Sequence, residues 1–445
     1  MPVRRFLWFI ALLIAPLAAQ EKLRVIIETD AGGDPDDEQS LVRFLVYANE
    51  WDIEGIIANR PTAREPENRN TVRTGLGIVR RLLDAYGEVY PRLGENAAGF
   101  PTKQHLWERT VAGYDDTDDG VNLIIAAVDH ADPRPVWFQN WGTDRGSAES
   151  CLKRALDRVR KERGPEGYAQ FKRRILLSSA DKFGDHTYAI APAFTFWLCP
   201  SLPKLDGGNW YHRFGPLTAT AGGFDLERDV RTGHGPLGAL YPTNTNIRQK
   251  EGDTPMFTYL IPTGMSDPRQ PAWGGWAGRF GVRDDIEPRQ PAYHWANLRD
   301  TLDGTTNRDH TLARWAADLQ NDFRARMDWC VQPPTEANHP PRAVLNGEGT
   351  KKILRLTTRA GTELAVSAAG SSDPDGHALA HEWSVYPEAG THRGAVKLTG
   401  ATSEQAKLAI PADAAGASIH LLLAVRDDGA PTLASYRRLV IDVVP

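Results

Sequence analysis

Residues 23–39, LRVIIETDAGGDPDDEQ, join an apolar run to a dense set of carboxylates. The β-branched run 25–27 predicts a buried strand. Gly32 and Gly33 follow it and permit a tight turn. Because open parallel α/β sheets bind ligands beyond the carboxyl ends of their strands, the loop after this strand is the candidate functional site.

Six carboxylates lie within eleven residues of this stretch: Glu28, Asp30, Asp34, Asp36, Asp37 and Glu38. Side chains this close repel one another unless a cation neutralises them. Ca²⁺ takes six to eight oxygen ligands in proteins, so the sequence predicts a Ca²⁺ site here. The alternative is a solvated acidic turn whose aspartate caps the next helix.

Strand-like and helical patterns alternate through the first 330 residues. Helical spacing of apolar residues occurs at 41–48, at 72–83 before Gly87, and at 152–159, while strand-like runs occur at 53–58, 135–143 and 174–179. This order predicts an α/β fold with a mostly parallel sheet flanked by helices. Glycine, proline and aromatic residues dominate 209–283 and predict long functional loops.

The pattern changes after a proline-rich segment at 331–342, which predicts a stiff linker. Apolar residues then alternate with period two, for example at Leu364, Val366 and Ala368, and turn-rich clusters separate these runs. Several short strands in about 100 residues predict a small all-β sandwich over 343–445. The segment 371–383, SSDPDGHALAHEW, resembles the turn and strand of PKD and related Ig-like domains.

The composition and the first residues limit location and partners. Residues 1–20 combine Arg4 and Arg5 with an apolar run and Ala18-Ala19, which predicts a cleaved signal peptide and a secreted or periplasmic protein without a membrane anchor. A retained anchor is the alternative. The net charge of −5 and the lack of a long basic run argue against nucleic acid as a partner. Three cysteines allow at most one internal disulfide, and their pairing stays open.

The acidic stretch resembles the N-terminal signature of the nucleoside hydrolase family. Asp30 matches its first aspartate, Gly32 its glycine, and Asp36 and Asp37 its aspartate pair. Ala31 replaces the family's proline, and two extra residues precede the pair. This longer form is more similar to a secreted family of cellulose-binding proteins with a nucleoside-hydrolase-like domain, and the resemblance covers residues 22–330.

The resemblance implies roles for the residues of the first loop and of its neighbour. Asp30 would act as general base and metal ligand, Asp36 would bind a sugar hydroxyl, and Asp37 would hold Ca²⁺. Asn59 ends the next strand, where the family places a substrate-contacting asparagine. A structural asparagine at a strand end is the alternative.

The resemblance also implies two ligands from later segments. Asp253, in the stretch 251–255, would bind both metal and substrate, and the backbone carbonyl of Thr143 would complete the calcium shell. Gly252 stands where the family often has a histidine, which puts protonation of the leaving group in doubt. His234 is a candidate for protonating the leaving group instead, and a structural role is the alternative.

Trp273 and Trp276 flank two glycines on a predicted flexible loop. Flat apolar rings with a polar edge suit the faces of sugars, so both residues are candidates for substrate binding. Ordinary packing is the alternative.

Two functions fit these patterns. The first is a secreted Ca²⁺-dependent hydrolase of glycosidic or N-glycosyl bonds, acting on a carbohydrate or nucleoside-like small molecule. The second is a non-catalytic carbohydrate-binding protein, cellulose-type by resemblance. The aspartate set favours the hydrolase, while the missing histidine and the appended sandwich favour the binding protein. Assembly into a homo-oligomer stays open.

Overall fold

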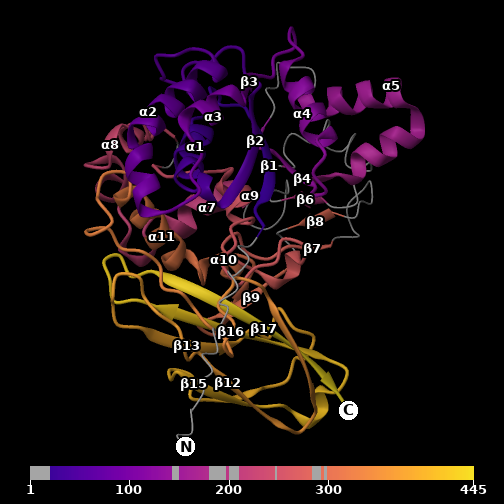
Figure 1. Ribbon diagram of the computed structural model, residues 1–445, viewed down its shortest axis with the longest axis vertical. Helices are drawn as coiled ribbons and strands as arrows, with labels where there is room; N and C mark the ends of the chain where they lie inside the picture. Colours follow the sequence, from indigo (N-terminus) through magenta and orange to yellow (C-terminus); the bar gives the residue numbers. More distant parts are fainter. Residues whose placement is uncertain are drawn as a thin grey trace, which may run out of the picture.

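The computed structural model describes residues 21–142, 150–179, 197–199, 210–245, 248–282, 292–294 and 298–445. The predicted signal peptide and Thr143 lie outside the described residues. Figure 1 shows an α/β region above a smaller region built of strands, with the C-terminus at the lower end. No helix among the described residues is long and apolar enough to cross a membrane.

An eight-stranded sheet lies at the centre of the α/β region, in the order β3-β2-β1-β4-β5-β6-β8-β7. Its neighbouring strands run parallel, except for the antiparallel pair β7 and β8. The strands are β1 (Leu23–Thr29), β2 (Trp51–Ala58), β3 (Thr110–Ala112), β4 (Val136–Asn140), β5 (Ile175–Ser179), β6 (Trp197–Cys199), β7 (Gly281–Val282) and β8 (Ala292–His294).

Helices cover both faces of this sheet, as the sequence predicts. In β1, Val25 and Ile27 belong to one hydrophobic core, with residues of α1 (Asp36–Val46) and α2 (Gly75–Asn96). Ile26 points to the opposite core, with residues of α4 (Asp119–Asp129) and α5 (Cys151–Arg173). Successive side chains of a strand alternate between faces, so an unbroken apolar run serves a strand that is buried on both sides.

The α/β region has six further helices among the described residues, and five of them are shorter than α1 and α4. They are α3 (Lys103–Glu108), α7 (Trp210–Thr218), α8 (Gly235–Ala239), α9 (Thr254–Thr258), α10 (His310–Ala313) and α11 (Ala316–Asp328). Single turns of 3₁₀ or π helix occupy 48–50, 221–223, 227–231 and 271–273. The segment 209–283 therefore holds several short helices where the sequence predicts long loops.

The expected end of the second helix at Gly87 is wrong, because α2 continues to Asn96. A Cβ atom at Gly87 would lie 2.6 Å from Cδ of Lys103, so the glycine provides room for a neighbouring side chain rather than an end to the helix. Buried Tyr86, Val89 and Leu93 anchor this last part to the core. Tertiary packing thus overrides the low helix propensity of glycine.

The C-terminal region consists of two sheets that share one core. A four-stranded sheet has the order β11-β17-β16-β13, and a three-stranded sheet has the order β12-β15-β14. Trp383, Leu408 and Leu421 belong to the core that both sheets contribute to. The strands are β11 (Leu354–Arg359), β12 (Glu363–Ser367), β13 (Ala380–Val385), β14 (Lys397–Thr399), β15 (Gln405–Ala409), β16 (Ser418–Arg426) and β17 (Ala434–Val444). A 3₁₀ turn occupies 412–414.

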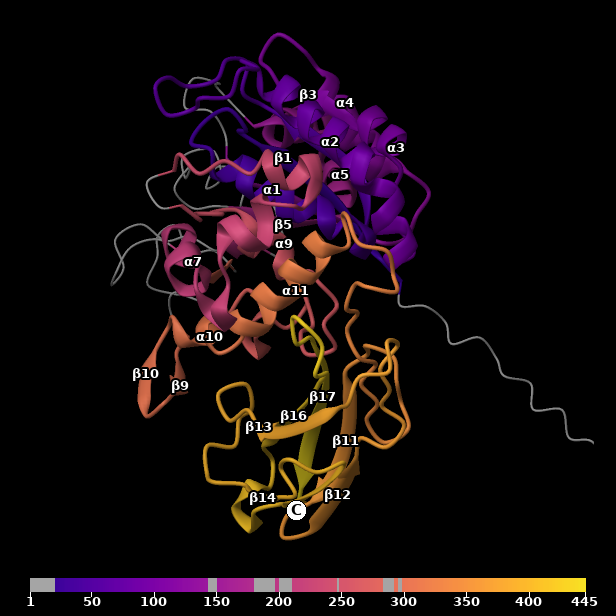
Figure 2. The same cartoon turned by 90° about the vertical axis from the view of Figure 1, so that its left-hand side faces the viewer.

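The four-stranded sheet packs its second face against the α/β region, below α11 (Figure 2). Leu422, Ala424 and Tyr436 belong to the large core of the α/β region, while Leu421 and Leu423 belong to the core of the sandwich. The strand β16 is therefore buried on both faces. A separate hairpin, β9 (Asp300–Leu302) and β10 (Thr305–Asn307), lies near this interface.

Candidate functional site

A cluster of buried carboxylates forms where β1 ends. After Thr29 the chain turns, and α1 begins with Asp36 and Asp37, which are 5% and 3% exposed. Asp253, 5% exposed, arrives just before α9. Ligand atoms of the three aspartates lie within 4.8 Å of one another. We call Asp36, Asp37 and Asp253 the acidic cluster.

The turn before the cluster depends on glycine. Gly32 has a φ of 99°, which side-chain-bearing residues rarely adopt. The amide of Gly33 donates a 2.9 Å hydrogen bond to the carbonyl of Asp30, which closes the turn. A Cβ atom at Gly33 would lie 3.0 Å from Oδ2 of Asp30, so the small residue leaves this carboxylate in its position.

The acidic cluster is electrostatically unfavourable by itself. Burial raises the pKa of Asp37 well above its usual range. The charges of three carboxylates raise it further: Asp253, Asp30 and Asp36. The hydroxyl of Thr29 donates a hydrogen bond to Asp37, which opposes the shift. Asp30 also contributes negative charge at this position. It is half-buried, whereas Asp36, Asp37 and Asp253 are buried, so Asp30 is the most exposed of the four carboxylates.

A lysine that sequence reasoning did not single out contacts the cluster. Nζ of Lys250 lies 3.2 Å from Oδ2 of Asp36 and forms an ion pair with Asp34. The side chain of Lys250 is 3% exposed, while that of Asp34 is 33% exposed. The backbone amide of Lys250 donates to the side-chain oxygen of Gln39 at 2.8 Å, which ties this segment to α1. A lysine beside Glu251 looks like a surface residue in the sequence, so no pattern indicated its role.

A second buried polar pair lies beneath the loop. Glu28 and Asn59, at 0% and 1% exposed, end or follow the neighbouring strands β1 and β2. Nδ2 of Asn59 lies 3.4 Å from Oε1 of Glu28 and donates a 2.7 Å hydrogen bond to the carbonyl of Gly142. The amide of Cys151 also donates to Glu28, at 2.9 Å. Burial raises the pKa of Glu28 to about 7. The sequence indicated that Asn59 lies beside the end of the first strand, but no pattern indicated a role for Glu28.

Two oxygen atoms of this pair lack partners. Oε2 of Glu28 and Oδ1 of Asn59 are buried and form no hydrogen bond with the described residues. Buried polar atoms without partners are costly and often mark functional positions. Both oxygen atoms can therefore accept a hydrogen bond from a further polar group.

His234 does not take part in the acidic cluster. Its Nε2 lies 3.0 Å from Oδ1 of Asp328, at the end of α11. The residue itself precedes α8, which packs on α2. These contacts favour a structural role for His234, the alternative to protonation of the leaving group.

The loop that carries Trp273 and Trp276, which we call the tryptophan loop, lies in the interface between the α/β region and the C-terminal region. It does not lie beside the acidic cluster. Trp276 is 4% exposed, so its expected exposure is wrong. The half-buried ring of Trp273 contacts the ring of His420 edge-on, with centroids 4.9 Å apart. Gly274 has a φ of 82°, and a Cβ atom there would lie 2.7 Å from Arg279. The two glycines thus permit close packing, where the sequence suggested a flexible loop.

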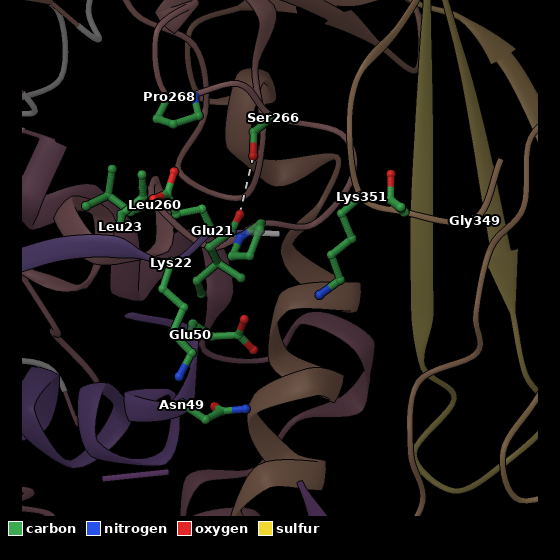
Figure 3. Close-up of a pocket in the computed structure, with 13 residues that line it drawn as sticks. Glu21, Lys22, Leu23, Asn49, Glu50, Leu260, Ser266, Pro268, Gly349 and Lys351 are labelled. Carbon is green, nitrogen blue, oxygen red and sulfur yellow. Dashed lines mark hydrogen bonds between the residues drawn. The ribbon is translucent and has the colours of Figure 1, made fainter. Parts of the chain in front are cut away.

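A separate crevice of about 360 Å³ lies at the opposite end of β1 (Figure 3). Lys22 and Glu50 from the α/β region and Lys351 from the C-terminal region line it. Leu23 lines the crevice, so the six residues 24–29 of β1 separate it from the acidic loop, which corresponds to roughly 20 Å of extended chain. The crevice is therefore not part of the acidic cluster.

The fold and the position of the acidic loop define a nucleoside-hydrolase-like α/β protein with an appended all-β region. The chain belongs to the family described as cellulose-binding Sde182, nucleoside hydrolase-like domain, whose model matches residues 24–280. The C-terminal domain of cellulose-binding protein Sde0182 matches residues 363–443.

A solved structure resembles nearly the whole chain. It is a nucleoside hydrolase-related hypothetical protein from Saccharophagus degradans that is associated with carbohydrate metabolism. The two are 34% identical with a TM-score of 0.75, over 95% of this chain and all of the other. The PKD domain of the KIAA 1837 protein is 15% identical over 24% of this chain and 92% of its own, with a TM-score of 0.18. No curated protein matches the chain.

Proposed function

We propose that this protein is a secreted or periplasmic Ca²⁺-dependent hydrolase of glycosidic or N-glycosyl bonds, acting on a sugar-containing substrate at the acidic loop. The observation that carries the proposal is the convergence of Asp36, Asp37 and Asp253, all buried, with ligand atoms within 4.8 Å. Structural carboxylates are normally paired with basic groups when buried. Here Lys250 pairs with Asp36, while burial and then the charges of Asp253, Asp30 and Asp36 raise the pKa of Asp37.

The donor set fits a hard divalent cation. Carboxylate oxygens from two segments converge, and Ca²⁺ prefers oxygen ligands. Asp37, Asp253 and Asp30 would hold the ion, with Thr143 as a further proposed ligand. A bound Ca²⁺ would offset part of the negative charge of the cluster and make a water molecule more acidic.

The side chains around the ion then have separate tasks. Asp30 is the most exposed of the four carboxylates, so it can accept the proton of an attacking water. Asp36 and Asn59 would bind sugar hydroxyls, since one offers a charged acceptor and the other an amide whose oxygen has no hydrogen-bond partner among the described residues. The water oxygen would bond to the anomeric carbon as the bond to the leaving group breaks, and the leaving group would depart with that electron pair and take a proton from solvent. The anionic surroundings stabilise positive charge that develops on the sugar.

A non-catalytic carbohydrate-binding protein is the second candidate. Two observations favour it: Lys250 already neutralises part of the cluster through Asp36, and Gly252 stands where the related family often has a histidine. The description of the matched family as cellulose-binding also supports it. The interface position of Trp273 and Trp276 removes the tryptophan loop as an exposed stacking surface, although both residues were proposed for substrate binding.

The variant Asp30→Asn separates the two functions. For a hydrolase, turnover should fall by roughly 10²–10⁴, the usual contribution of a general base, with Ca²⁺ content measured in parallel. Asp116→Asn is the matched control, because it removes one exposed carboxylate from a loop outside the cluster. Substrates would be a panel of nucleosides and of cello-oligosaccharides. A wild-type protein that is inert on the whole panel with Ca²⁺ present, yet is retained on cellulose, would support the binding protein instead.

A further inference from the structure

A cavity of about 230 Å³ lies between α1, α2, the loop that precedes α2 and the segment that follows α8. Glu38, Arg81, Asn68 and Asn244 line it, one from each of these four segments. Nδ2 of Asn244 donates a 2.8 Å hydrogen bond to the carbonyl of Glu67, which joins two of the walls. We call this cavity the Glu38 pocket, and it shares no lining residue with the crevice of Figure 3.

Glu38 brings a buried carboxylate to the pocket. The residue is 3% exposed, and Nδ2 of Asn68 donates a 2.6 Å hydrogen bond to its Oε1. Oε2 is buried and accepts no hydrogen bond from any described residue. Asn68 is itself buried, and the amide of Asn70 donates to its Oδ1 at 3.0 Å. Because a buried charged oxygen without a partner is costly, a hydrogen-bond donor on a ligand would stabilise this arrangement.

The pocket carries charges of both signs, since Arg69 and Arg81 line it together with Glu38. The hydrogen bonds that Arg81 makes to described residues, to Asn70 at 2.9 Å and Thr71 at 3.3 Å, both start from Nη1. Its Nη2 can therefore donate to a ligand. The carboxylate disfavours an anion and the two arginines disfavour a cation. A neutral group whose hydroxyls both donate and accept hydrogen bonds fits this set.

The other walls of the pocket are largely apolar. Ile78 and Leu82 of α2 and Leu240 after α8 contribute them, with Pro35 and Pro242. Binding sites for small molecules usually combine such walls with a few polar groups that fix orientation. The volume is below the range of about 300–1,000 Å³ that is typical of drug-sized ligands, so the pocket suits one small ring. A sugar ring has this character, because its faces present CH groups and its edge presents hydroxyls.

The Glu38 pocket adjoins the acidic cluster. Pro35 directly precedes Asp36, and Glu38 directly follows Asp37. In a helix, Cα atoms two residues apart, such as those of Asp36 and Glu38, are separated by roughly 5 Å, and their side chains leave on opposite sides. A substrate that crosses the first turn of α1 would therefore reach both sites.

We propose that the Glu38 pocket binds a second neutral sugar ring of the substrate, linked to the ring at the acidic cluster. Hydroxyls of this second ring donate to Glu38 and accept from Arg81. The inference rests on the proposed function, because it takes the acidic loop as the site of the first ring. It specifies the substrate as two or more linked sugars, in place of a nucleoside.

Calorimetric titration of the full chain with Ca²⁺ present tests the pocket. The probes are glucose and the sulfur-linked analogue of cellobiose, whose linkage resists hydrolysis. The wild type should bind the analogue at least roughly tenfold more tightly than glucose, because the second ring adds hydrogen bonds to charged groups. In Glu38→Gln and in Arg81→Met this ratio should fall toward one. Glu88→Gln and Arg92→Met make the same changes at exposed residues of α2 and should keep the ratio.

Ca²⁺ content and melting temperature are measured for each variant, because Glu38 is next to Asp37. If Glu38→Gln loses Ca²⁺ or melts at a lower temperature, Arg81→Met decides the test, since α2 holds no residue of the acidic cluster. An unchanged ratio in both variants would overturn the proposal and leave the pocket to water. A wild type that binds neither probe, or binds both equally, would overturn it as well.

Turnover is measured separately with Asp30→Asn, so the two proposals can fail independently. A wild type that cleaves no substrate, yet binds the analogue in a way that depends on Glu38 and Arg81, would contradict the hydrolase and support the pocket. A wild type that cleaves its substrate, with a binding ratio that neither variant changes, would do the reverse.

Discussion

The acidic cluster and the interface around Asp300 are both buried sets of charges, and they are built in opposite ways. Asp300 is 0% exposed and meets Nη1 of Arg279 at 2.6 Å and Nη1 of Arg314 at 2.9 Å. The hydroxyl of Tyr386, from the C-terminal region, donates a further hydrogen bond to it. Each carboxylate oxygen of Asp300 has a partner, whereas at the acidic cluster the charges of Asp253, Asp30 and Asp36 add to burial in raising the pKa of Asp37. Opposite charges hold the two regions together at Asp300, whereas like charges gather at the acidic cluster and Lys250 offsets part of them through Asp36.

The largest effect is expected at the interface around Asp300, for the variant Asp300→Ala. The change leaves buried Arg279 and half-buried Arg314 without their shared carboxylate, so the free energy of unfolding should fall by about 3–5 kcal/mol. Urea denaturation followed by circular dichroism measures it. Asp157→Ala is the control, because Asp157 is 59% exposed and forms a surface pair with Lys153, where the loss should stay below about 1 kcal/mol. Similar losses in the two variants would show that the interface is not held by this network.

Acid should weaken the interface through His420. Burial and the charges of neighbouring arginines lower the pKa of His420 from 6.5 to about 3, and its Nδ1 lies 2.8 Å from Nη1 of Arg438. The unfolded chain takes up this proton near pH 6.5, while the folded chain does so only near pH 3. The unfolded state therefore binds more protons between these values, and stability falls as the pH drops through that window.

At pH 5 this histidine should cost about 2 kcal/mol of stability relative to pH 7. The measurement is urea denaturation at both pH values for the wild type and for His420→Asn, whose amide oxygen can still accept from Arg438. The variant should lose that part of the pH dependence, and His130→Asn, at an exposed position, should keep it. An unchanged pH dependence in His420→Asn would contradict the assignment.

The smallest effect has the opposite sign and concerns the acidic cluster. In chelator, Asp37→Asn should raise the free energy of unfolding by about 1 kcal/mol, because it removes a buried charge that repels three carboxylates. The same variant should lose the stabilisation that Ca²⁺ gives to the wild type. Thermal melting with and without Ca²⁺ measures both, with Asp116→Asn as the control. A destabilised variant in chelator would mean that the cluster is already compensated.

The α/β fold was predictable because its signals are local. The run 25–27 alternates between two cores in a strand that is buried on both faces, and Asp36, Asp37 and Asn59 follow strands whose carboxyl ends meet at one edge. The convergence of Asp253 with the cluster came from the family resemblance, because 216 residues separate it from Asp37. No periodicity carries information over that separation.

The sequence by itself determined the parallel sheet, the carboxylates of the loop after β1 and the change to period two in the C-terminal region. Each depends on neighbours along the chain, whose side chains share a face or a turn. Only the tertiary structure decided that Lys250 contacts the acidic cluster and that Trp276 is buried at the interface. It also decided that both faces of β16 are covered, since the packing of a second surface depends on segments far away in the chain.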